Sequence, residues 1–399
     1  MPQKINEIIN VSSITHSLSA SSRVKRSLKL WQETQLPEIY HALLDYYQNL
    51  GNKLFSYPSR IGNITTPIYV QPEWQGLTEA HLRMAMQERI VTYQPSGMQL
   101  QFWNFYNQMK NNQLYDGRIF RLTNLETSDQ TLNLNFEIGQ FSHSVMCHYL
   151  LEHELIIALS NKASLHNSLA IRNQVAGDER LIITFFQNNV TRIGINNLIL
   201  IRKDPDTYLA LSRKKTMQSM IQHHLFDQIS SCIFEIIDSP ENDFNLQNTV
   251  LRETAEELFG QTDQTLTQNQ LNKTNKNQEL NELQRMLKNG SAAFQVTGFC
   301  IDLVRLVPEI TTLLVVQDET FFKHFVGENT HLNDEFLPGL FFQIPCDLDD
   351  VDAFLKSEIV SDPDGDPSIK GFNPIHWTLP GGFSFYQGLK RAVDLKLLN

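Results

Sequence analysis

One stretch of the sequence decides how this chain is interpreted, and it reads Leu246-Gln247-Asn248-Thr249-Val250-Leu251-Arg252-Glu253-Thr254-Ala255-Glu256-Glu257-Leu258-Phe259-Gly260. On a helix that turns by about 100° per residue, the side chains of Leu246, Val250 and Leu258 share one face with Thr254, and we expect this face to pack against the rest of the protein. Glu253, Glu256 and Glu257 fall in an arc of about 100° beside this face. Gly260 is well placed to end the helix.

Three carboxylates this close together repel one another, because like charges at i and i+4 destabilise a helix. Arg252 offsets part of this repulsion, and a divalent cation would offset more. Hard cations such as Mg²⁺ and Mn²⁺ prefer oxygen ligands. A metal held there can activate water and neutralise charge that develops on a phosphate. The pattern therefore predicts a metal site at Glu253, Glu256 and Glu257, although a solvated, salt-bridged helix face explains the same residues.

Downstream of this helix, the sequence predicts a polar insertion, two strands and a closing helix. The insertion, residues 261–282, is rich in Gln, Asn and Thr and has almost no aliphatic residues, which favours a flexible surface segment. The predicted strands are 294–303 and 311–317, and the predicted helices are 283–287, 319–326, 348–358 and 384–397.

Upstream, the sequence alternates between helical and strand patterns. Residues 1–60 are expected to be helical, further helices are expected at 78–94 and 144–160, and a loop is expected at 58–75. Strands are expected at 118–123, 132–138, 181–186, 197–203, 207–213 and 233–237. The polar turns 126–130 and 204–206 predict two β-hairpins. The chain as a whole is therefore expected to be of mixed α/β class.

The predicted elements follow one another as a hairpin, a short strand, a loop, the acidic helix, two strands and a late helix. This order resembles that of a Nudix domain. The core Arg252-Glu253-x-x-Glu256-Glu257 resembles the core of the Nudix box. The resemblance implies a mixed sheet sandwiched by helices, Mg²⁺ or Mn²⁺ bound by Glu253, Glu256 and Glu257, and hydrolysis of a nucleoside diphosphate linked to another group. By the same resemblance, the catalytic residues are Glu253, Glu256 and Arg252. One of the glutamates, or a carboxylate elsewhere, is the general base, and Arg252 holds the glutamates in place.

The loop half of the Nudix box departs from the family pattern. Asp238 stands where the family has Gly, and Phe244 stands where it has Glu. Thr254 replaces an aliphatic residue, and Gly260 lies one position later than usual. Glu241 and Asp243 are candidates for the missing carboxylate.

The resemblance covers residues 171–399, so we expect a Nudix-like domain there and an α+β region of unknown role at 1–170. The segments 248–260, 296–303 and 308–316 are also similar to uncharacterised bacterial proteins with a Nudix-like C-terminal portion.

Composition narrows the class of protein. The chain has 399 residues, of which 41% are hydrophobic, and a formal charge of −11. This content is typical of a folded protein, and the acidic balance disfavours nucleic-acid binding. A basic cluster at Arg23, Lys25, Arg26 and Lys29 is expected to be a solvated helix face, with a nucleic-acid arm or an organelle transit segment as the alternatives. No apolar run reaches the roughly 18 residues that a membrane span needs.

The four cysteines are far apart and form no C-x-x-C pair, which argues against disulfides and against a cysteine zinc site. We therefore expect a reducing compartment, the cytoplasm by default. One segment holds a cluster of His143, Cys147, His148 and His153. These residues lack the spacing of a zinc site, so we expect them to be packed or singly exposed.

Two functions remain open from the sequence. The first is a Mg²⁺-dependent pyrophosphohydrolase of Nudix type. The second is a catalytically inactive Nudix-like protein that senses a nucleotide-like small molecule. In the second case residues 1–170 bind a protein partner or a second copy of the chain.

Overall fold

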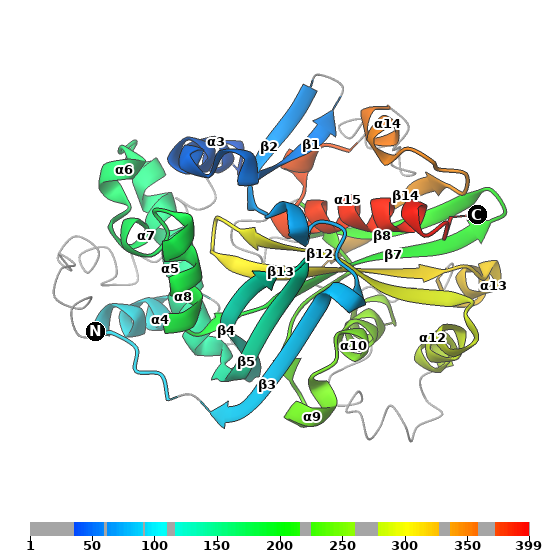
Figure 1. The fold of residues 1–399 in the computed structure, drawn as a ribbon, viewed down its shortest axis with the longest axis horizontal. Helices are drawn as coiled ribbons and strands as arrows, with labels where there is room; N and C mark the ends of the chain where they lie inside the picture. Colours follow the sequence, from blue (N-terminus) through cyan, green and yellow to red (C-terminus); the bar gives the residue numbers. More distant parts are fainter. Residues whose placement is uncertain are drawn as a thin grey trace.

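The computed structural model describes residues 36–59, 62–90, 92–109, 116–215, 225–259, 278–326, 336–357 and 372–398. Two mixed β-sheets flanked by helices form its framework (Figure 1). The mixed α/β class expected from the sequence is confirmed. None of the described helices is both long and apolar enough to cross a membrane. The four cysteines are all free thiols.

The larger sheet has nine strands, with seven in the order β1-β2-β12-β13-β7-β8-β14, while β9 pairs with β8 and β10 with β7. Its strands are β1 (Leu54–Ser59), β2 (Gly62–Tyr69), β7 (Gly194–Asp204), β8 (Thr207–Lys215), β9 (Phe226–Gln228), β10 (Ser230–Ile233), β12 (Ala292–Asp302), β13 (Val307–Val316) and β14 (Phe336–Pro345). The β7–β8 and β12–β13 hairpins are antiparallel, whereas β13 and β7 run parallel. The sheet is therefore mixed.

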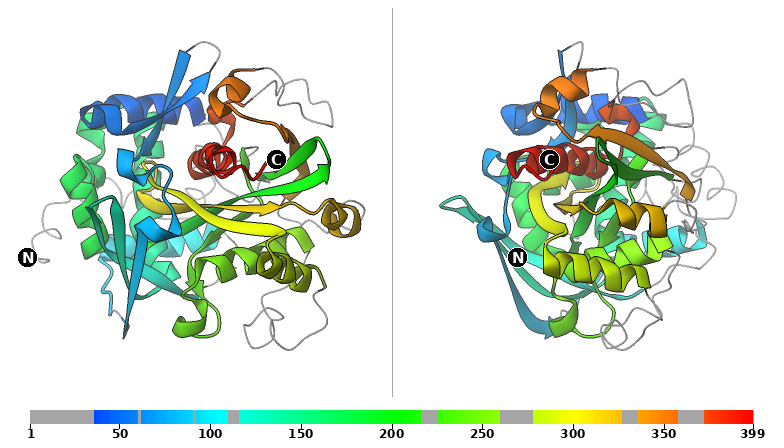
Figure 2. Two further views of the ribbon diagram at one scale, coloured as in Figure 1. Left: turned by 45° about the vertical axis from the view of Figure 1, so that its right-hand side comes forward. Right: turned by 90° about the vertical axis from the view of Figure 1, so that its right-hand side faces the viewer.

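Helices cover both faces of the larger sheet (Figure 2). The closing helix α15 (Leu379–Asp394) packs on β7, β12 and β13. It lies so close that a Cβ at Gly388 would come within 2.7 Å of the side chain of Leu198. On the opposite face, α10 (Leu246–Phe259) and α12 (Gln278–Asn289) bury their apolar residues against β7 and β13. The predicted helix at 246–259 is thus confirmed with its bounds.

The smaller sheet has the order β11-β4-β5-β3, with β6 paired to β4. Its strands are β3 (Leu82–Ile90), β4 (Arg118–Ser128), β5 (Thr131–Gln140), β6 (Thr191–Arg192) and β11 (Glu235–Ile236). The predicted hairpin β4–β5 is confirmed, and β3 adds to it in parallel.

The described residues also form the helices α3 (Leu36–Tyr46), α4 (Gly97–Met109), α5 (Phe141–Ser160), α6 (Leu165–Ser168), α7 (Ala170–Val175), α8 (Glu179–Asn188), α9 (Pro240–Asp243), α13 (Glu319–Phe321) and α14 (Val351–Lys356). Of these, α4 packs on α5, and α8 packs on β4.

The helix expected at 78–94 is wrong, because residues 82–90 form strand β3. Leu82, Met84 and Met86 alternate with more polar residues and pack against the main core. This period of two is the strand signal, and it outweighs the weaker helical spacing. The loop expected at 58–75 is also wrong in part, since β2 occupies 62–69. The helical region expected over 1–60 is wrong at its end, where residues 54–59 form β1 and pair with β2.

The strand expected at 181–186 is wrong as well, because these residues lie in α8. The Asp178 side chain caps this helix by accepting a hydrogen bond from the backbone N–H of Leu181 at 2.9 Å. Ile182, Phe185 and Phe186 are its buried residues, which matches a helical face. A short apolar run does not by itself separate a strand from a buried helix.

The two sheets draw strands from both halves of the chain. β2 pairs with β12 through Tyr69 and Ile301, so the first half contributes to the larger sheet. β6 and β11 come from the second half and join the smaller sheet. The predicted boundary between residues 170 and 171 stays a prediction. Most of the predicted polar insertion lies outside the described residues, and its end, from residue 278, belongs to α12.

Candidate functional site

The start of α10 is fixed by its own sequence. The side chain of Asn245 accepts a hydrogen bond from the backbone N–H of Asn248 at 3.0 Å. The carbonyl of Asn245 accepts from the backbone N–H of Thr249 at 3.0 Å. An asparagine in this position satisfies backbone donors that the first turn leaves without a partner. The helix phase, and with it the direction of each glutamate, is set here.

Thr254 ties α10 to the larger sheet. Its hydroxyl lies 2.6 Å from the hydroxyl of Ser230 on β10 and donates to the carbonyl of Val250. Thr254, which stands where the Nudix pattern has an aliphatic residue, is thus buried and held by hydrogen bonds. This contact places the turn that carries Arg252 and Glu253 beside β10.

Arg252 lies at the centre of a charged cluster. Only 5% of its surface is exposed, and its guanidinium donates to the carboxylate of Glu235 on β11 at 3.4 Å. Burial lowers the pKa of Arg252, but the carboxylates of Glu235, Glu253 and Glu256 raise it above its usual value. The guanidinium therefore sits among carboxylates from two elements. We call Glu235, Glu253, Glu256 and Glu257 the acidic cluster.

The three glutamates of α10 face the protein and not open solvent. Glu257 is 7% exposed, and Glu253 and Glu256 are partly buried. Glu253 also lies beside Cys232 of β10, where burial raises the pKa of the thiol and the Glu253 carboxylate raises it further. The arc deduced from helix phase thus lies between α10, β10 and β11.

The acidic cluster has the donor chemistry of a site for Mg²⁺ or Mn²⁺, since carboxylate oxygens are the ligands these cations prefer. Among the described residues, however, the side chains as they lie gather no group of three or more His, Cys, Asp or Glu around one point that could hold a metal ion. Metal binding by Glu253, Glu256 and Glu257 stays a prediction.

Phe244, in the place of the family's glutamate, anchors the loop before α10. Its ring lies 5.1 Å from that of Phe120, 5.4 Å from that of Phe136 and 5.6 Å from that of Phe234. Aromatic rings at such separations stabilise one another. This position therefore packs the loop onto the smaller sheet and supplies no carboxylate.

The two candidate replacements for that carboxylate lie elsewhere. Asp243 accepts hydrogen bonds from the backbone N–H groups of Ile237 and Asp238, at 2.9 and 2.7 Å, and so shapes the loop. Glu241 is exposed in the short helix α9 (Pro240–Asp243), near Glu88 of β3. The structure gives neither of them a place in the acidic cluster.

Two of the histidines of α5, His148 and His153, are buried in the core, whereas His143 is partly buried. The Nδ1 of His148 is hydrogen-bonded to the carbonyl oxygen of Arg305 at 2.9 Å, and burial lowers its pKa to about 3. His153 lies against the rings of Phe102 and Phe105, and burial lowers its pKa to about 4. Both imidazoles are neutral at physiological pH.

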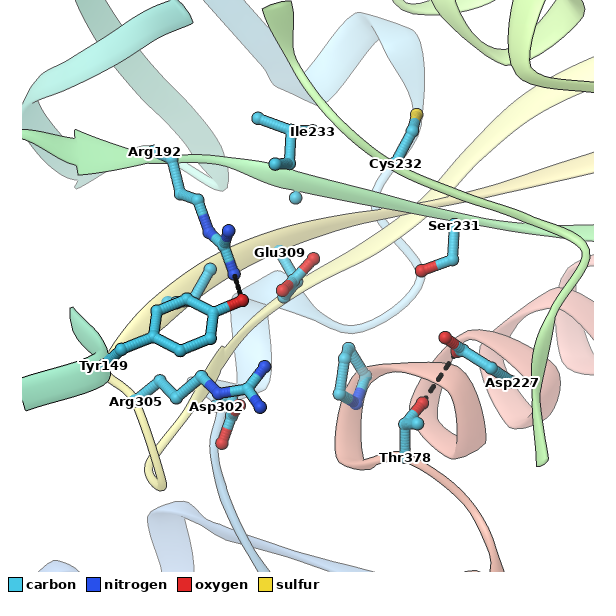
Figure 3. A pocket seen from close by; sticks show the side chains of 13 residues that line it. Tyr149, Arg192, Asp227, Ser231, Cys232, Ile233, Asp302, Arg305, Glu309 and Thr378 are labelled. Atoms are coloured by element: carbon cyan, nitrogen blue, oxygen red, sulfur yellow. Dashed lines mark hydrogen bonds between the residues drawn. The ribbon is translucent and has the colours of Figure 1, made fainter. Parts of the chain in front are cut away.

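The structure also contains a cavity of about 190 Å³ that sequence patterns did not reveal. Tyr149 of α5, Arg192 of β6, Glu309 of β13 and Thr378 at the start of α15 are among its lining residues (Figure 3). These residues are far apart in the sequence, so no local spacing links them. The one signal in the sequence was Glu309, a single charged residue in the mostly apolar run that forms β13.

No protein-family model matches the chain, and no curated protein matches it. The relationship to the Nudix family, which rests on the residues around Arg252, stays a prediction.

Proposed function

We propose that the chain is a Nudix-type hydrolase that cleaves a nucleoside diphosphate-linked substrate at the acidic cluster. The observation that carries this proposal is the position of Arg252. Its buried guanidinium pairs with Glu235 and lies among the carboxylates of Glu253 and Glu256. A buried arginine in this position fixes the direction of carboxylates that would otherwise repel one another.

The order of the elements supports the same function. Along the chain, the elements come in the order β7–β8 hairpin, short strand β10, loop, α10, β12–β13 hairpin and α15. In space, α10 and α15 cover opposite faces of one mixed sheet. This arrangement is the one that the resemblance to the family implies.

Each residue of the site has a proposed role. Glu256 accepts the proton of the attacking water, Glu253 orients that water, and Arg252 positions both carboxylates. Mg²⁺ or Mn²⁺ bound by Glu253, Glu256 and Glu257 would neutralise charge on the diphosphate. Because Glu253 and Glu256 are partly buried, their charges are screened less by water than they would be on an open surface.

The test is hydrolysis of a panel of nucleoside diphosphate derivatives in the presence of Mg²⁺ or Mn²⁺. Loss of a general base typically lowers the rate by about 10²–10⁴-fold, which is the effect expected for Glu256→Gln. The matched control is Glu282→Gln on α12, a glutamate that pairs with Arg285 at the surface. The proposal is wrong if no substrate is turned over faster by the wild type than by the Glu256→Gln variant.

A second function, nucleotide binding without hydrolysis, is favoured by Phe244. An aromatic anchor stands where the family has a catalytic-loop glutamate. In this case nucleotides raise the unfolding temperature, because a ligand at about 100 times its Kd stabilises a protein by about 2.7 kcal/mol. Size-exclusion chromatography would show whether the chain also forms a homo-oligomer. Efficient metal-dependent hydrolysis would count against this second function.

A further inference from the structure

The cavity of about 190 Å³ is lined by residues of α5, β6, β10 and β13 and of the start of α15 (Figure 3). Its volume exceeds the roughly 30 Å³ that one water molecule occupies in the liquid, so a ligand of several heavy atoms fits. Cys232 is one of the lining residues and also lies beside Glu253, so the cavity borders the surroundings of the acidic cluster. The chemistry of its other lining residues indicates what it can bind.

Arg192 is a buried cation in the wall of this cavity. It is 8% exposed, and its Nη2 donates to the hydroxyl of Tyr149 at 3.3 Å. Its Nε is buried without a hydrogen-bond partner. Within the part of the chain that the structure describes, no carboxylate forms an ion pair with Arg192. A buried charge without a counter-ion is costly, and an anionic ligand would relieve this cost.

The hydroxyl of Tyr149 is a second donor at the same end of the cavity. Its oxygen accepts the hydrogen bond from Arg192, so its own proton is available to another acceptor. No acceptor among the described residues takes this proton. Figure 3 shows the guanidinium of Arg192 pointing at this hydroxyl. Two donors therefore converge at one point of the cavity wall, which is an arrangement suited to an oxyanion.

Arg305, the other arginine of the cavity, already has a counter-ion. Its Nε and Nη2 donate to the two carboxylate oxygens of Glu152, at 2.7 and 3.1 Å. Its guanidinium also lies 4.5 Å from the ring centroid of Tyr149. The bidentate pair engages two of its donors, so Arg192 is the guanidinium that a ligand can engage.

The carboxylates of the lining are held by groups of the protein. Asp227 accepts a hydrogen bond at 2.7 Å from the threonine that caps α15, and Asp302 accepts one at 2.7 Å from the backbone N–H of Val304. Glu309 accepts a hydrogen bond from Asn196 at 2.8 Å. Asp227 and Glu309 take part in further interactions besides these. The lining carboxylates are thus engaged within the protein.

The acidity of Tyr149 reports the sign of the electrostatic potential at this end of the cavity. Burial raises the pKa of Tyr149, but Arg192 and Arg305 outweigh burial and the opposing carboxylate of Glu152, and they lower this pKa to about 8. A partly buried phenol ionises so readily only where the net potential is positive. The same potential attracts an anion and repels a cation.

We propose that this end of the cavity binds a small oxyanion of the phosphate type. Two of its oxygens accept hydrogen bonds from the guanidinium of Arg192, and a third accepts one from the hydroxyl of Tyr149. A phosphate group suits these donors better than a carboxylate, because only the tetrahedral group carries a third oxygen. Binding of this anion does not require hydrolysis at α10.

The first test is calorimetric titration of the full chain with inorganic phosphate at neutral pH. EDTA is present, so that no metal ion at the acidic cluster can hold the anion. Phosphate is expected to bind with a Kd below about 1 mM. Arg192→Met and Tyr149→Phe are each expected to weaken binding by about tenfold or more, because each removes a hydrogen bond to a charged group. Arg285→Met, which changes an exposed arginine on α12, is the control and is expected to bind like the wild type.

Three further probes define the chemical class of the ligand. Acetate is expected to bind more weakly than phosphate, and methylamine is expected not to bind. Glycerol 3-phosphate separates the two sources of the group: tighter binding than inorganic phosphate assigns the site to a phosphate ester, and weaker binding assigns it to the free ion. The proposal is overturned if methylamine binds as tightly as phosphate, or if Arg192→Met binds phosphate as the wild type does.

The second test follows Tyr149 in the wild type, so it does not depend on whether a variant folds. Sulfate is the probe, because it has the shape of phosphate and does not titrate in this pH range. Saturating sulfate is expected to raise the pKa of Tyr149 from about 8 by about one unit, because the anion offsets the cations of Arg192 and Arg305. By reciprocity, sulfate should bind about tenfold less tightly once Tyr149 has ionised.

A tyrosinate absorbance titration with and without sulfate measures this shift, and Tyr149→Phe identifies the group. The other charged and titratable neighbours of Tyr149 are Glu152 on α5, whose charge is constant in this range, and Tyr106 on α4, whose pKa burial raises. An unchanged titration at saturating sulfate overturns the proposal. So does a Kd for phosphate weaker than about 1 mM.

Discussion

Replacing Arg305 by Met tests the buried ion pair that joins α5 to the β12–β13 turn. The guanidinium makes two hydrogen bonds to Glu152, whose side chain is 2% exposed. It also lies 4.5 Å from the centroid of the Tyr149 ring. The substitution removes the cation and leaves the carboxylate of Glu152 buried in the core.

The expected loss follows from these two contacts. Removing one partner of a buried ion pair costs about 3–5 kcal/mol, because the remaining charge has no counter-ion. The lost cation–π contact adds about 1 kcal/mol. Arg305→Met should therefore lower the free energy of unfolding by about 4–6 kcal/mol, a large share of the roughly 5–15 kcal/mol that stabilises a typical protein.

Urea unfolding followed by tryptophan fluorescence measures this loss. The double variant Arg305→Met with Glu152→Gln should lose less stability than the sum of the two single variants, because the pair is coupled. Arg285→Met, in an exposed pair, is the control and should change stability little. The reasoning is refuted if Arg305→Met destabilises the protein no more than Arg285→Met does.

Two more predictions concern the loop and the cavity. Phe244→Ala should lower the free energy of unfolding by about 3 kcal/mol, because it removes a ring from a cluster of four aromatic side chains. Phe244→Leu should lower it clearly less in the same urea assay. Equal losses for the two variants would contradict the packing role of Phe244. Burial raises the pKa of Tyr149, but Arg192 and Arg305 outweigh burial and lower it to about 8, against the smaller opposing effect of Glu152. Its other titratable neighbour, Tyr106 of α4, has a pKa raised by burial. A tyrosinate absorbance titration should therefore show one group near pH 8 that Tyr149→Phe removes. The pKa of Tyr149 is lower in the folded protein than in the unfolded chain, so its ionisation favours the folded state. The free energy of unfolding of the wild type should therefore rise relative to that of Tyr149→Phe as the pH goes from about 8 to 10. A difference between the two proteins that does not change with pH would refute this.

Local sequence patterns predicted that the three glutamates of α10 lie on one arc of the helix. Helix phase placed Glu253, Glu256 and Glu257 on one arc, and Asn245 provides the cap that fixes that phase. These features depend on contacts within a few residues, which a sequence displays directly. The partner of Arg252 could not be predicted in this way, because Glu235 comes from a strand that pairs with the smaller sheet.

Two predicted elements were wrong because a short segment can fit both a helix and a strand pattern. In both cases packing against distant elements decided which one formed. Residues 82–86 alternate like a strand, and β5 provides the pairing partner that makes them one. Residues 181–186 are apolar enough for a strand, but the cap at Asp178 and packing on β4 make them a helix. Burial against distant elements outweighs intrinsic preference over such lengths.

The sequence by itself determined the mixed α/β class, the bounds of α10, both predicted hairpins and the phase of the acidic residues. All of these follow from side-chain periodicity and turn chemistry over fewer than about twenty residues. Only the tertiary structure decided that β1 and β2 join the larger sheet, and that Arg192 and Glu309 face one cavity. Such arrangements arise from pairing between strands more than a hundred residues apart, and no local periodicity records them.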